Sequence, residues 1–599
     1  MSDNVLLFEL SWEICNKVGG IYTVLTSKAR LIAEKYNNYF LVGPYFENKA
    51  KYEFKEEEPG DYIKDIFNYL ITQGIKCYYG TWLIKGNPKT ILIDFKNYIH
   101  NKDKIKTDLW NNLKVDSLFS NWDFEEPMIW ATAASKLIES FYHLNRFRII
   151  LHCHEWLAGF ALLNTKINNL NIATVFTTHA TMLGRTLSSS SISLYDNLDS
   201  IDPYKEAEKY NIKDKFTTEV ACALNSDVFT TVSEITPIES EKFLGRKPDV
   251  LLLNGLDSDE FPSFEETSLE HIENREIIRE FISYYFFPYY FFDLEQTLNF
   301  FIVGRYEFKN KGIDIFIKSL GKLNKIMQNE DSRKTIITFI WIPTQVQSAK
   351  LSIAKNKSNY HLLQHFLEKN SEKLNRRIIE NMLQVMDNNF LISEKALSQK
   401  MPFDEEFYEE SRKLRLNFMK EENPPLITHD IQNENDDLII KALRENGLEN
   451  KKEDKIKVIF YPVYLTGVDG LLDLEYYKAI SGCHLGLFPS YYEPWGYTPL
   501  ESTAWGVPSL TTDLGGFGRF LMLKNKTDEG VFVLKRFKRS EEEVVNNFTE
   551  ILHKFTKLDR KGRVDQKLIA KEISKLADWN EFIKYYYEAY DLALSKKGM

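Results

Sequence analysis

The sequence contains few cysteines, and they show no pairing pattern. The five cysteines among its 599 residues are scattered and odd in number, and no two of them form a CxxC motif: Cys15, Cys77, Cys153, Cys222 and Cys483. This distribution argues against a disulfide framework and is typical of a protein from a reducing compartment.

A long apolar segment is also missing. The most apolar window, residues 281–292, is far shorter than the ~20 residues that a helix needs to cross a bilayer. The first residues, MSDNVLLFELSWE, lack a basic stretch followed by a long apolar one, so no signal peptide is expected. We therefore expect a soluble cytoplasmic protein that does not bind membranes.

Two common catalytic signatures are absent from the sequence. It has no GxSxG motif, the nucleophile elbow of one class of serine hydrolases. It has no GxxxxGK[ST] loop either, so the P-loop mode of phosphate binding is excluded. With 76 basic and 86 acidic residues, the net charge is −10. This balance argues against a general nucleic-acid-binding protein, although it still allows a local site for an anion.

Short apolar runs alternate with helical patterns along most of the chain, which is typical of parallel α/β layers. Because single cores stop growing near ~250–300 residues, we expect two doubly wound domains, at residues 1–275 and 296–575. Strands are expected at residues 5–8, 39–42, 148–151, 173–177, 228–232 and 250–253, and then at 299–303, 336–340, 457–461, 485–488 and 509–511.

Two further helical regions are expected. Residues 345–455 are polar and charged with a helical pattern, which indicates a helical insertion in the second domain. Residues 566–594 read as a helix with one apolar face, formed by Trp579, Phe582, Ile583, Tyr586 and Tyr590.

The densest chemical signal extends from Ser490 to Glu501 and lies between an expected strand and an expected helix. Thr498 to Glu501 has the form of a capping box with a proline at the first helical position. The amides of Gly496, Tyr497 and Thr498 would then be free to bind a phosphate at the helix N-terminus. Glu493, just before them, suggests a functional carboxylate, whereas Glu501 reads equally well as a mere helix cap.

Two other turns between a strand and a helix carry basic residues. Arg305 and Lys311 are placed to reach a shared anion, such as a diphosphate leaving group, although a solvated basic turn is the competing interpretation. Lys17, with Gly19 and Gly20, precedes the first helix, where glycines let the backbone approach a ligand closely.

Histidines follow two other strands. His179 and Arg185 come after the strand at residues 173–177, at the edge of the sheet where ligands bind in open α/β folds. His152 and His154 share a strand face, which invites a metal interpretation. No third ligand and no HExxH spacing are evident in the sequence, so a metal site is the weaker interpretation.

Five stretches of the chain, taken in order, resemble the glycogen synthases of the animal and fungal type. They are residues 16–22, 154–159, 178–181, 304–312 and 482–508, and the last stretch is the most specific. The resemblance implies a GT-B fold, in which two Rossmann-like domains face a cleft and residues 576–599 cross back to the first domain. It also implies transfer of glucose from UDP-glucose to an α-1,4-glucan with retention of configuration, without a metal or other cofactor.

The resemblance also assigns roles to residues. Glu493 positions the donor glucose, His179 faces it, and Arg305 and Lys311 hold the diphosphate. The remaining matches bind substrate: Lys17 near the phosphates, Glu501 at the ribose, Tyr476 and Tyr464 around the uracil, and Arg185 and Asn254 along the sugar cleft. The inserted helices resemble a segment that forms tetramers, so a homo-oligomer is expected, whereas no priming partner is indicated.

The sequence also bears on regulation and leaves two other functions open. The stretch before the last helix has few arginines, which predicts weak or no activation by glucose 6-phosphate. Its basic stripe of Arg563, Lys567, Lys571 and Lys575 reads as a solvated helix face. The alternatives are a GT-B transferase with another donor or acceptor, such as ADP-glucose or a disaccharide product, and a catalytically silent glucan-binding subunit.

Overall fold

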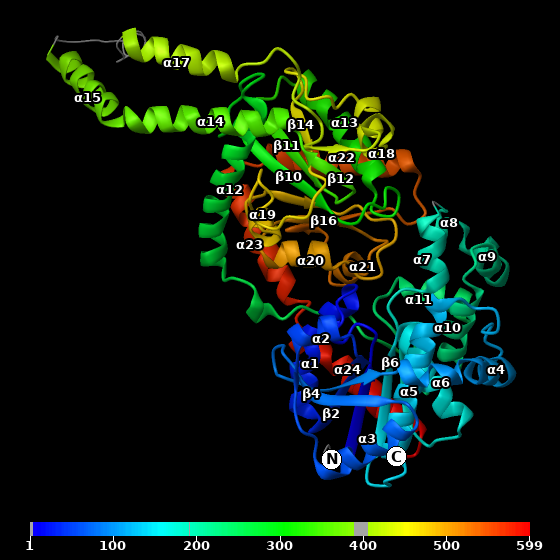
Figure 1. Ribbon diagram of the computed structural model, residues 1–599. Helices are drawn as coiled ribbons and strands as arrows, with labels where there is room; N and C mark the ends of the chain where they lie inside the picture. Colours follow the sequence, from blue (N-terminus) through cyan, green and yellow to red (C-terminus); the bar gives the residue numbers. More distant parts are fainter. Residues whose placement is uncertain (1–3, 191, 388–404) are drawn as a thin grey trace.

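The computed structural model describes residues 4–190, 192–387 and 405–599. It shows two α/β halves, each built on its own mainly parallel sheet, with the first half below the second in Figure 1. Among the described residues, no helix is both long and apolar enough to cross a membrane.

The sheet of the first half has nine strands in the order β3-β4-β5-β2-β1-β6-β7-β8-β9. The strands β3, β4 and β5 pair antiparallel at one edge, and the rest are parallel. Every strand predicted for this half is present, and the three strands of the antiparallel edge were not predicted. The strands are β1 (Val5–Leu10), β2 (Asn38–Pro44), β3 (Phe54–Glu56), β4 (Lys76–Trp82), β5 (Lys89–Asp94), β6 (Arg148–His154), β7 (Ala173–Thr178), β8 (Val228–Thr231) and β9 (Val250–Leu251).

The sheet of the second half has seven strands in the order β14-β11-β10-β15-β16-β18-β17. All five predicted strands occur in it, and the edge strands β17 and β18 were missed. The strands are β10 (Thr297–Val303), β11 (Thr335–Trp341), β14 (Ile456–Phe460), β15 (Leu485–Leu487), β16 (Ser509–Thr512), β17 (Asp528–Glu529) and β18 (Val531–Leu534).

The predicted insertion is helical over only part of its range. Three helices, α14 (Leu351–Lys369), α15 (Ser371–Asp387) and α17 (Glu405–Phe418), project from the second half in Figure 1. Residues 388–404 of the predicted insertion lie outside the described residues. The amphipathic helix α18 (Leu438–Glu445) belongs to the core of the second half instead, because it buries Ile439, Ile440 and Leu443.

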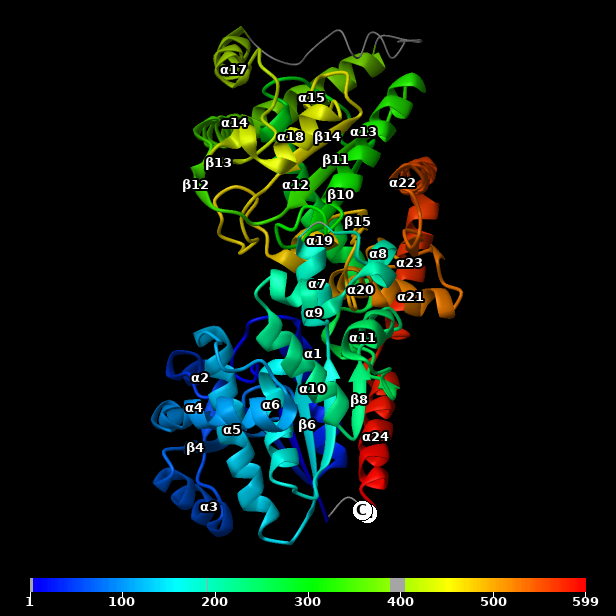
Figure 2. The ribbon, with the colours of Figure 1, turned by 90° about the vertical axis from the view of Figure 1, so that its right-hand side faces the viewer.

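The C-terminal region is two helices rather than the single one predicted. Helix α23 (Arg560–Lys575) ends before Asp578, which caps α24 (Trp579–Lys596). Figure 2 shows α24 alongside the first sheet, where it packs against β6, β7 and helix α1 (Gly20–Lys35). The Trp579 indole is fully buried and donates to Ser27 Oγ at 2.7 Å. The chain that left the first half through α12 (Phe264–Phe286) thus returns to it.

Candidate functional site

The carboxyl ends of the two sheets face each other, and the loops there carry the predicted site residues. Two loops of the second half are held tightly together, since the N–H of Tyr491 donates to the Asn310 carbonyl at 2.7 Å. Gly312 has a φ of +67°, and a Cβ there would lie 2.0 Å from the Pro489 carbonyl oxygen. Only glycine therefore allows the loop after β10 to approach the loop after β15 this closely.

This approach brings Lys311 and Glu493 together. The Nζ of Lys311 lies 2.5 Å from Oε2 of Glu493, and both side chains are about four-fifths buried, at 19% and 23% exposure. Ser490 Oγ donates to the same carboxylate oxygen at 3.4 Å. A small hollow is lined by Lys311, Ser490, Glu493 and Thr498, so a cation, a carboxylate and a helix start share one space.

Helix α20 (Tyr497–Ala504) begins beside this hollow, but not as the sequence suggested. Its N-cap is Gly496, with a φ of +107°, and a glycine has no side chain with which to cap the helix. The capping-box interpretation of Thr498 and Glu501 is therefore wrong. Without a side-chain cap, the N–H groups of the first turn remain available to an anion.

Glu501 points to the start of α19 (Tyr476–Ser481) instead of capping its own helix. It hydrogen-bonds with Tyr477, and burial raises its pKa to about 7, opposed by that hydrogen bond and by the charge of Lys17 from the first half. Burial and then the nearby Glu501 carboxylate raise the pKa of Tyr476. Tyr464 is 75% exposed, so of the two predicted uracil-contacting tyrosines only Tyr476 lies by Glu501.

The glycine loop of the first half already holds a carboxylate. Oε2 of Glu13 accepts the N–H groups of Gly19 at 2.8 Å and Tyr22 at 2.9 Å, at the start of α1. Gly20 and Lys17 are exposed, so the loop can offer its lysine to a ligand, while Glu13 already occupies two of the N–H groups at the start of the helix. Glu13 was not singled out in the sequence.

Arg305 is separate from Lys311 in this structure. Its side chain is 75% exposed, and its Nη2 lies 2.9 Å from Oε1 of Glu307. The two basic residues predicted to share an anion therefore lie on the same loop without lining the same hollow.

His179 is held from two sides at the end of β7. Its Nε2 lies 2.9 Å from Nδ1 of His154, while the N–H groups of His179 and Ala180 donate to Oε1 of Glu155 at 3.0 and 3.3 Å. Glu155 has a φ of +63°, a left-handed conformation that costs a non-glycine residue energy and often marks functional sites. Burial tends to lower the pKa of Arg185, on α7 (Met182–Ser189), but the nearby Glu155 carboxylate raises it above its usual value.

A buried cluster of charged and polar groups lies behind His179, and the sequence analysis missed it. Glu9, in the otherwise apolar β1, is fully buried and pairs with Lys28 at 2.6 Å and with His154 Nε2 at 2.7 Å. Glu9 is thus the third group that the metal interpretation of His152 and His154 lacked. The Lys28 ammonium already supplies the positive charge there, so the donor set does not suit a metal ion. A lone glutamate within VLLFEL was the available signal.

Glu239 and Tyr492 connect the two halves next to the site. The Tyr492 hydroxyl donates to Oε1 of Glu239 at 2.9 Å, and burial raises the pKa of Glu239 to about 7. Tyr492 directly precedes Glu493, so this buried contact holds the loop that carries Glu493 at a fixed distance from the first half. Nothing in the local sequence marked Glu239.

Asn254 lies in the loop after β9. It is 4% exposed, and its Oδ1 has no hydrogen-bond partner within the described residues. The same loop is bonded to the junction of α23 and α24, because the N–H of Leu256 donates to the Ala577 carbonyl at 2.9 Å. Asn254 therefore sits where the chain crosses between the halves.

The basic stripe of α23 is not a solvated face. Lys571 Nζ donates to the backbone carbonyls of Pro262 and Ala504, each at 2.5 Å. Burial and the neighbouring Arg275 lower the pKa of Lys567 to about 7. The solvated-face interpretation is thus wrong for these two lysines, while weak activation by glucose 6-phosphate stays a prediction that rates with and without the sugar phosphate check.

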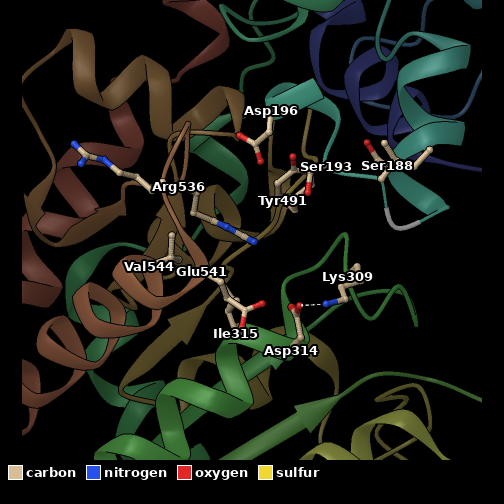
Figure 3. A pocket seen from close by; sticks show the side chains of 12 residues that line it. Ser188, Ser193, Asp196, Lys309, Asp314, Ile315, Tyr491, Arg536, Glu541 and Val544 are labelled. Atoms are coloured by element: carbon tan, nitrogen blue, oxygen red, sulfur yellow. Dashed lines mark hydrogen bonds and ion pairs between the residues drawn. The ribbon is translucent and has the colours of Figure 1, made fainter. Parts of the chain in front are cut away.

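Charged residues from both halves line a second hollow, shown in Figure 3. Ser188 and Asp196 come from the first half, while Asp314 and Arg536 come from the second. Asp314 accepts from Lys309 at 2.9 Å, and Arg536 Nη1 donates to the Pro489 carbonyl at 2.5 Å. This hollow shares no lining residue with the one at Lys311 and Glu493, so it is a neighbour of the site.

Comparisons with known proteins agree with this geometry. The glycogen synthase family model matches residues 9–598. The chain is 37% identical to glycogen [starch] synthase of Neurospora crassa and 36% identical to the liver glycogen [starch] synthase of Mus musculus, in each case over 99% of this chain and 84% of the relative.

A solved structure supports the fold independently. The catalytic domain of starch synthase IV from Arabidopsis thaliana, bound to ADP and acarbose, matches with a TM-score of 0.51 and 12% identity, covering 99% of this chain and 100% of that one. The predicted GT-B fold, two Rossmann-like domains that face a cleft, is confirmed.

Proposed function

This chain belongs to the glycogen synthase family, and from that premise we propose that it transfers glucose from UDP-glucose to the non-reducing end of an α-1,4-glucan with retention of configuration. Membership makes it a glycosyltransferase with a nucleotide-sugar donor and a glucan acceptor. The observation that carries the proposal is the Lys311–Glu493 pair, at 2.5 Å, beside the uncapped start of α20.

The positive groups of the second half suit a departing diphosphate. Lys311 and the first-turn N–H groups of α20 would neutralise the charge that develops as the bond from sugar to phosphate breaks. Arg305, exposed and paired with Glu307, would turn from that partner to the diphosphate as a bidentate donor. Closure of the cleft would exclude water and hold the acceptor hydroxyl against the anomeric carbon.

The arrangement of the two acids favours attack from the front face. A retaining glycosidase needs two carboxylates ~5 Å apart around one bond, whereas Glu501 bonds Tyr477 and only Glu493 adjoins Lys311. A carboxylate engaged by an ammonium is also a poor nucleophile. We propose that the leaving diphosphate accepts the proton of the acceptor hydroxyl while Glu493 positions the donor glucose.

We also propose that the reaction needs no metal and takes place in the cytoplasm. The one candidate metal cluster within the described ranges consists of Glu9, His152 and His154, and its carboxylate is already paired with Lys28. All five cysteines are buried and free, which suits a reducing compartment.

The proposal predicts incorporation of label from UDP-glucose into an α-1,4-linked polymer when the purified protein is mixed with glycogen. Incorporation should be much lower from ADP-glucose and lost in Glu493→Ala, while Glu445→Ala, which removes an exposed acid of α18, should behave as the wild type. Transfer to a small sugar alone would establish a different acceptor. UDP binding without any transfer would indicate the silent glucan-binding subunit.

We further propose a homo-oligomer, possibly a tetramer, assembled through the projecting helices. These helices carry several exposed leucines and isoleucines, and a large exposed apolar surface is typical of interfaces. These residues are between 50% and 62% exposed: Leu362, Leu367, Ile379, Leu383 and Leu416.

Light scattering tests this assembly. The wild type should have a multiple of the 70.3 kDa chain mass, and the double variant Ile379→Glu, Leu383→Glu should dissociate. Leu269→Glu changes a leucine of α12 that is 65% exposed and should leave the mass unchanged. A monomeric wild type would refute the proposal.

A further inference from the structure

A chain of hydrogen bonds leads from the core of the first half to His179. Lys28 Nζ and Tyr39 Oη donate to Glu9, at 2.6 Å on Oε1 and 2.5 Å on Oε2. Oε1 of Glu9 also lies 2.7 Å from His154 Nε2, and His154 Nδ1 lies 2.9 Å from His179 Nε2. Glu9, Lys28 and His154 are at most 1% exposed, and His179 is 7% exposed.

The direction of the first link follows from the charge of Glu9. Burial alone would raise the pKa of this carboxyl, but Lys28 and the hydrogen bond from His154 hold it well below its usual value. An ionised carboxylate only accepts hydrogen bonds. The hydrogen between Glu9 and His154 therefore resides on His154 Nε2.

The direction of the second link follows from the first. Burial lowers the pKa values of His154 and His179, so both rings are neutral and each carries one hydrogen. Because His154 carries its hydrogen on Nε2, its Nδ1 is an acceptor. His179 must then donate through its own Nε2, which leaves its Nδ1 without a hydrogen.

The remaining nitrogen of His179 is free to meet a ligand. No group among the described residues forms a hydrogen bond with Nδ1 of His179. The backbone at His179 is fixed by Glu155 at 3.0 Å, so the ring is held by both its backbone and its Nε2. The unpaired nitrogen is an acceptor of defined position.

We propose that Glu9 and His154 are positioning residues that hold His179 as its Nε2–H tautomer, so that its Nδ1 accepts a hydrogen bond from a hydroxyl of the bound sugar. This inference rests on the proposed function for the identity of the ligand. An acceptor at this point selects a hydroxyl and disfavours a phosphate oxygen or a carboxylate, because neither can donate. It would thus help to place the sugar, rather than the diphosphate, against the first half.

Nitrogen NMR of the ¹⁵N-histidine-labelled full chain reads the tautomer directly, without turnover. The signals of His179 among the 11 histidines are assigned from their loss in His179→Gln. We expect a protonated Nε2 and an unprotonated Nδ1 for His179. A proton on Nδ1, or an imidazolium, at neutral pH would overturn the proposal.

Variants of two neighbouring histidines separate positioning from mere packing. His154→Leu removes the acceptor for His179, whereas His154→Asn places an amide oxygen near the former Nδ1. His152→Leu is the matched control. His152 is equally buried on the same strand and lies 3.4 Å from Glu9, but its hydrogen bonds go to Thr177 and Tyr590 and not to His179.

We expect His154→Leu to lower kcat by about 10–100-fold, the size of effect found when a partner that orients a metal-bound histidine is lost, with a smaller change in KM for the donor. His154→Asn should recover most of this loss, and its His179 should remain the Nε2–H tautomer. His152→Leu should keep kcat near the wild-type value even if its Tm falls as far. Equal losses of kcat in both leucine variants, or no recovery in His154→Asn, would refute positioning. A wild type that transfers no glucose but shows the expected tautomer would refute only the proposed function.

Discussion

Replacing Lys311 with alanine is expected to lower kcat by about 10²–10³-fold, the usual effect of removing one group that stabilises transition-state charge. Lys311 Nζ is the cation next to Glu493, and both side chains are about four-fifths buried. A charge in this sheltered place would act on the proposed leaving diphosphate with little screening by water. Steady-state rates of glucose transfer from UDP-glucose measure the effect.

Two further variants test whether the effect belongs to the site. Lys309→Ala removes a lysine of the same loop that pairs with Asp314 at 2.9 Å, and it should leave kcat near the wild-type value. Lys311→Ala combined with Glu493→Gln should lose less than the sum of the two single losses, because residues in direct contact are not additive. Full additivity, or an equal loss in Lys309→Ala, would show that the pair has no shared role.

Replacing Lys28 with methionine is expected to destabilise the first half by about 3–5 kcal/mol, the range found when one partner of a buried ion pair is removed. Both side chains of the Lys28–Glu9 pair have 0% exposure and lie 2.6 Å apart. Without the ammonium, the Glu9 carboxylate would remain buried, and its remaining partners would be the neutral Tyr39 and the histidines. The midpoint of unfolding in denaturant measures the change.

The double variant Lys28→Met, Glu9→Gln should recover much of this stability, since a neutral pair of similar size avoids the cost of an isolated charge. Lys554→Met is the surface control, because the Lys554–Glu550 pair on α22 (Glu541–Lys557) is 74% and 62% exposed and should contribute almost nothing. A double variant that is as unstable as Lys28→Met would show that packing, not charge, holds this part of the core.

Several site residues could be predicted from the sequence, because a residue that directly follows a strand lies at a known edge of the sheet. Lys311, Glu493 and His179 each follow a predicted strand, and the carboxyl ends of parallel strands gather at one edge of a sheet. The apolar face of Trp579 and Tyr586 likewise predicted a helix that buries that face. Such features depend on local periodicity, which the sequence displays directly.

Other parts of the site depended on backbone conformation. Thr498 to Glu501 matched a capping box, but the left-handed φ of Gly496 starts the helix earlier and turns Glu501 toward Tyr477. Arg305 was expected beside Lys311, yet it pairs with Glu307 on its own loop. A four-residue pattern does not specify which of its polar groups will meet a partner from another loop.

The sequence by itself thus determined the family, the two parallel sheets and the set of loops that carry the chemistry. Only the tertiary structure decided which charged groups meet: Glu9 with Lys28 and His154, Glu13 with the start of α1, and Glu239 with Tyr492 of the other half. The physical reason is distance along the chain. Periodicity decides which face of an element is buried, whereas a buried polar group finds its partner only when sheets and helices from distant segments are packed together.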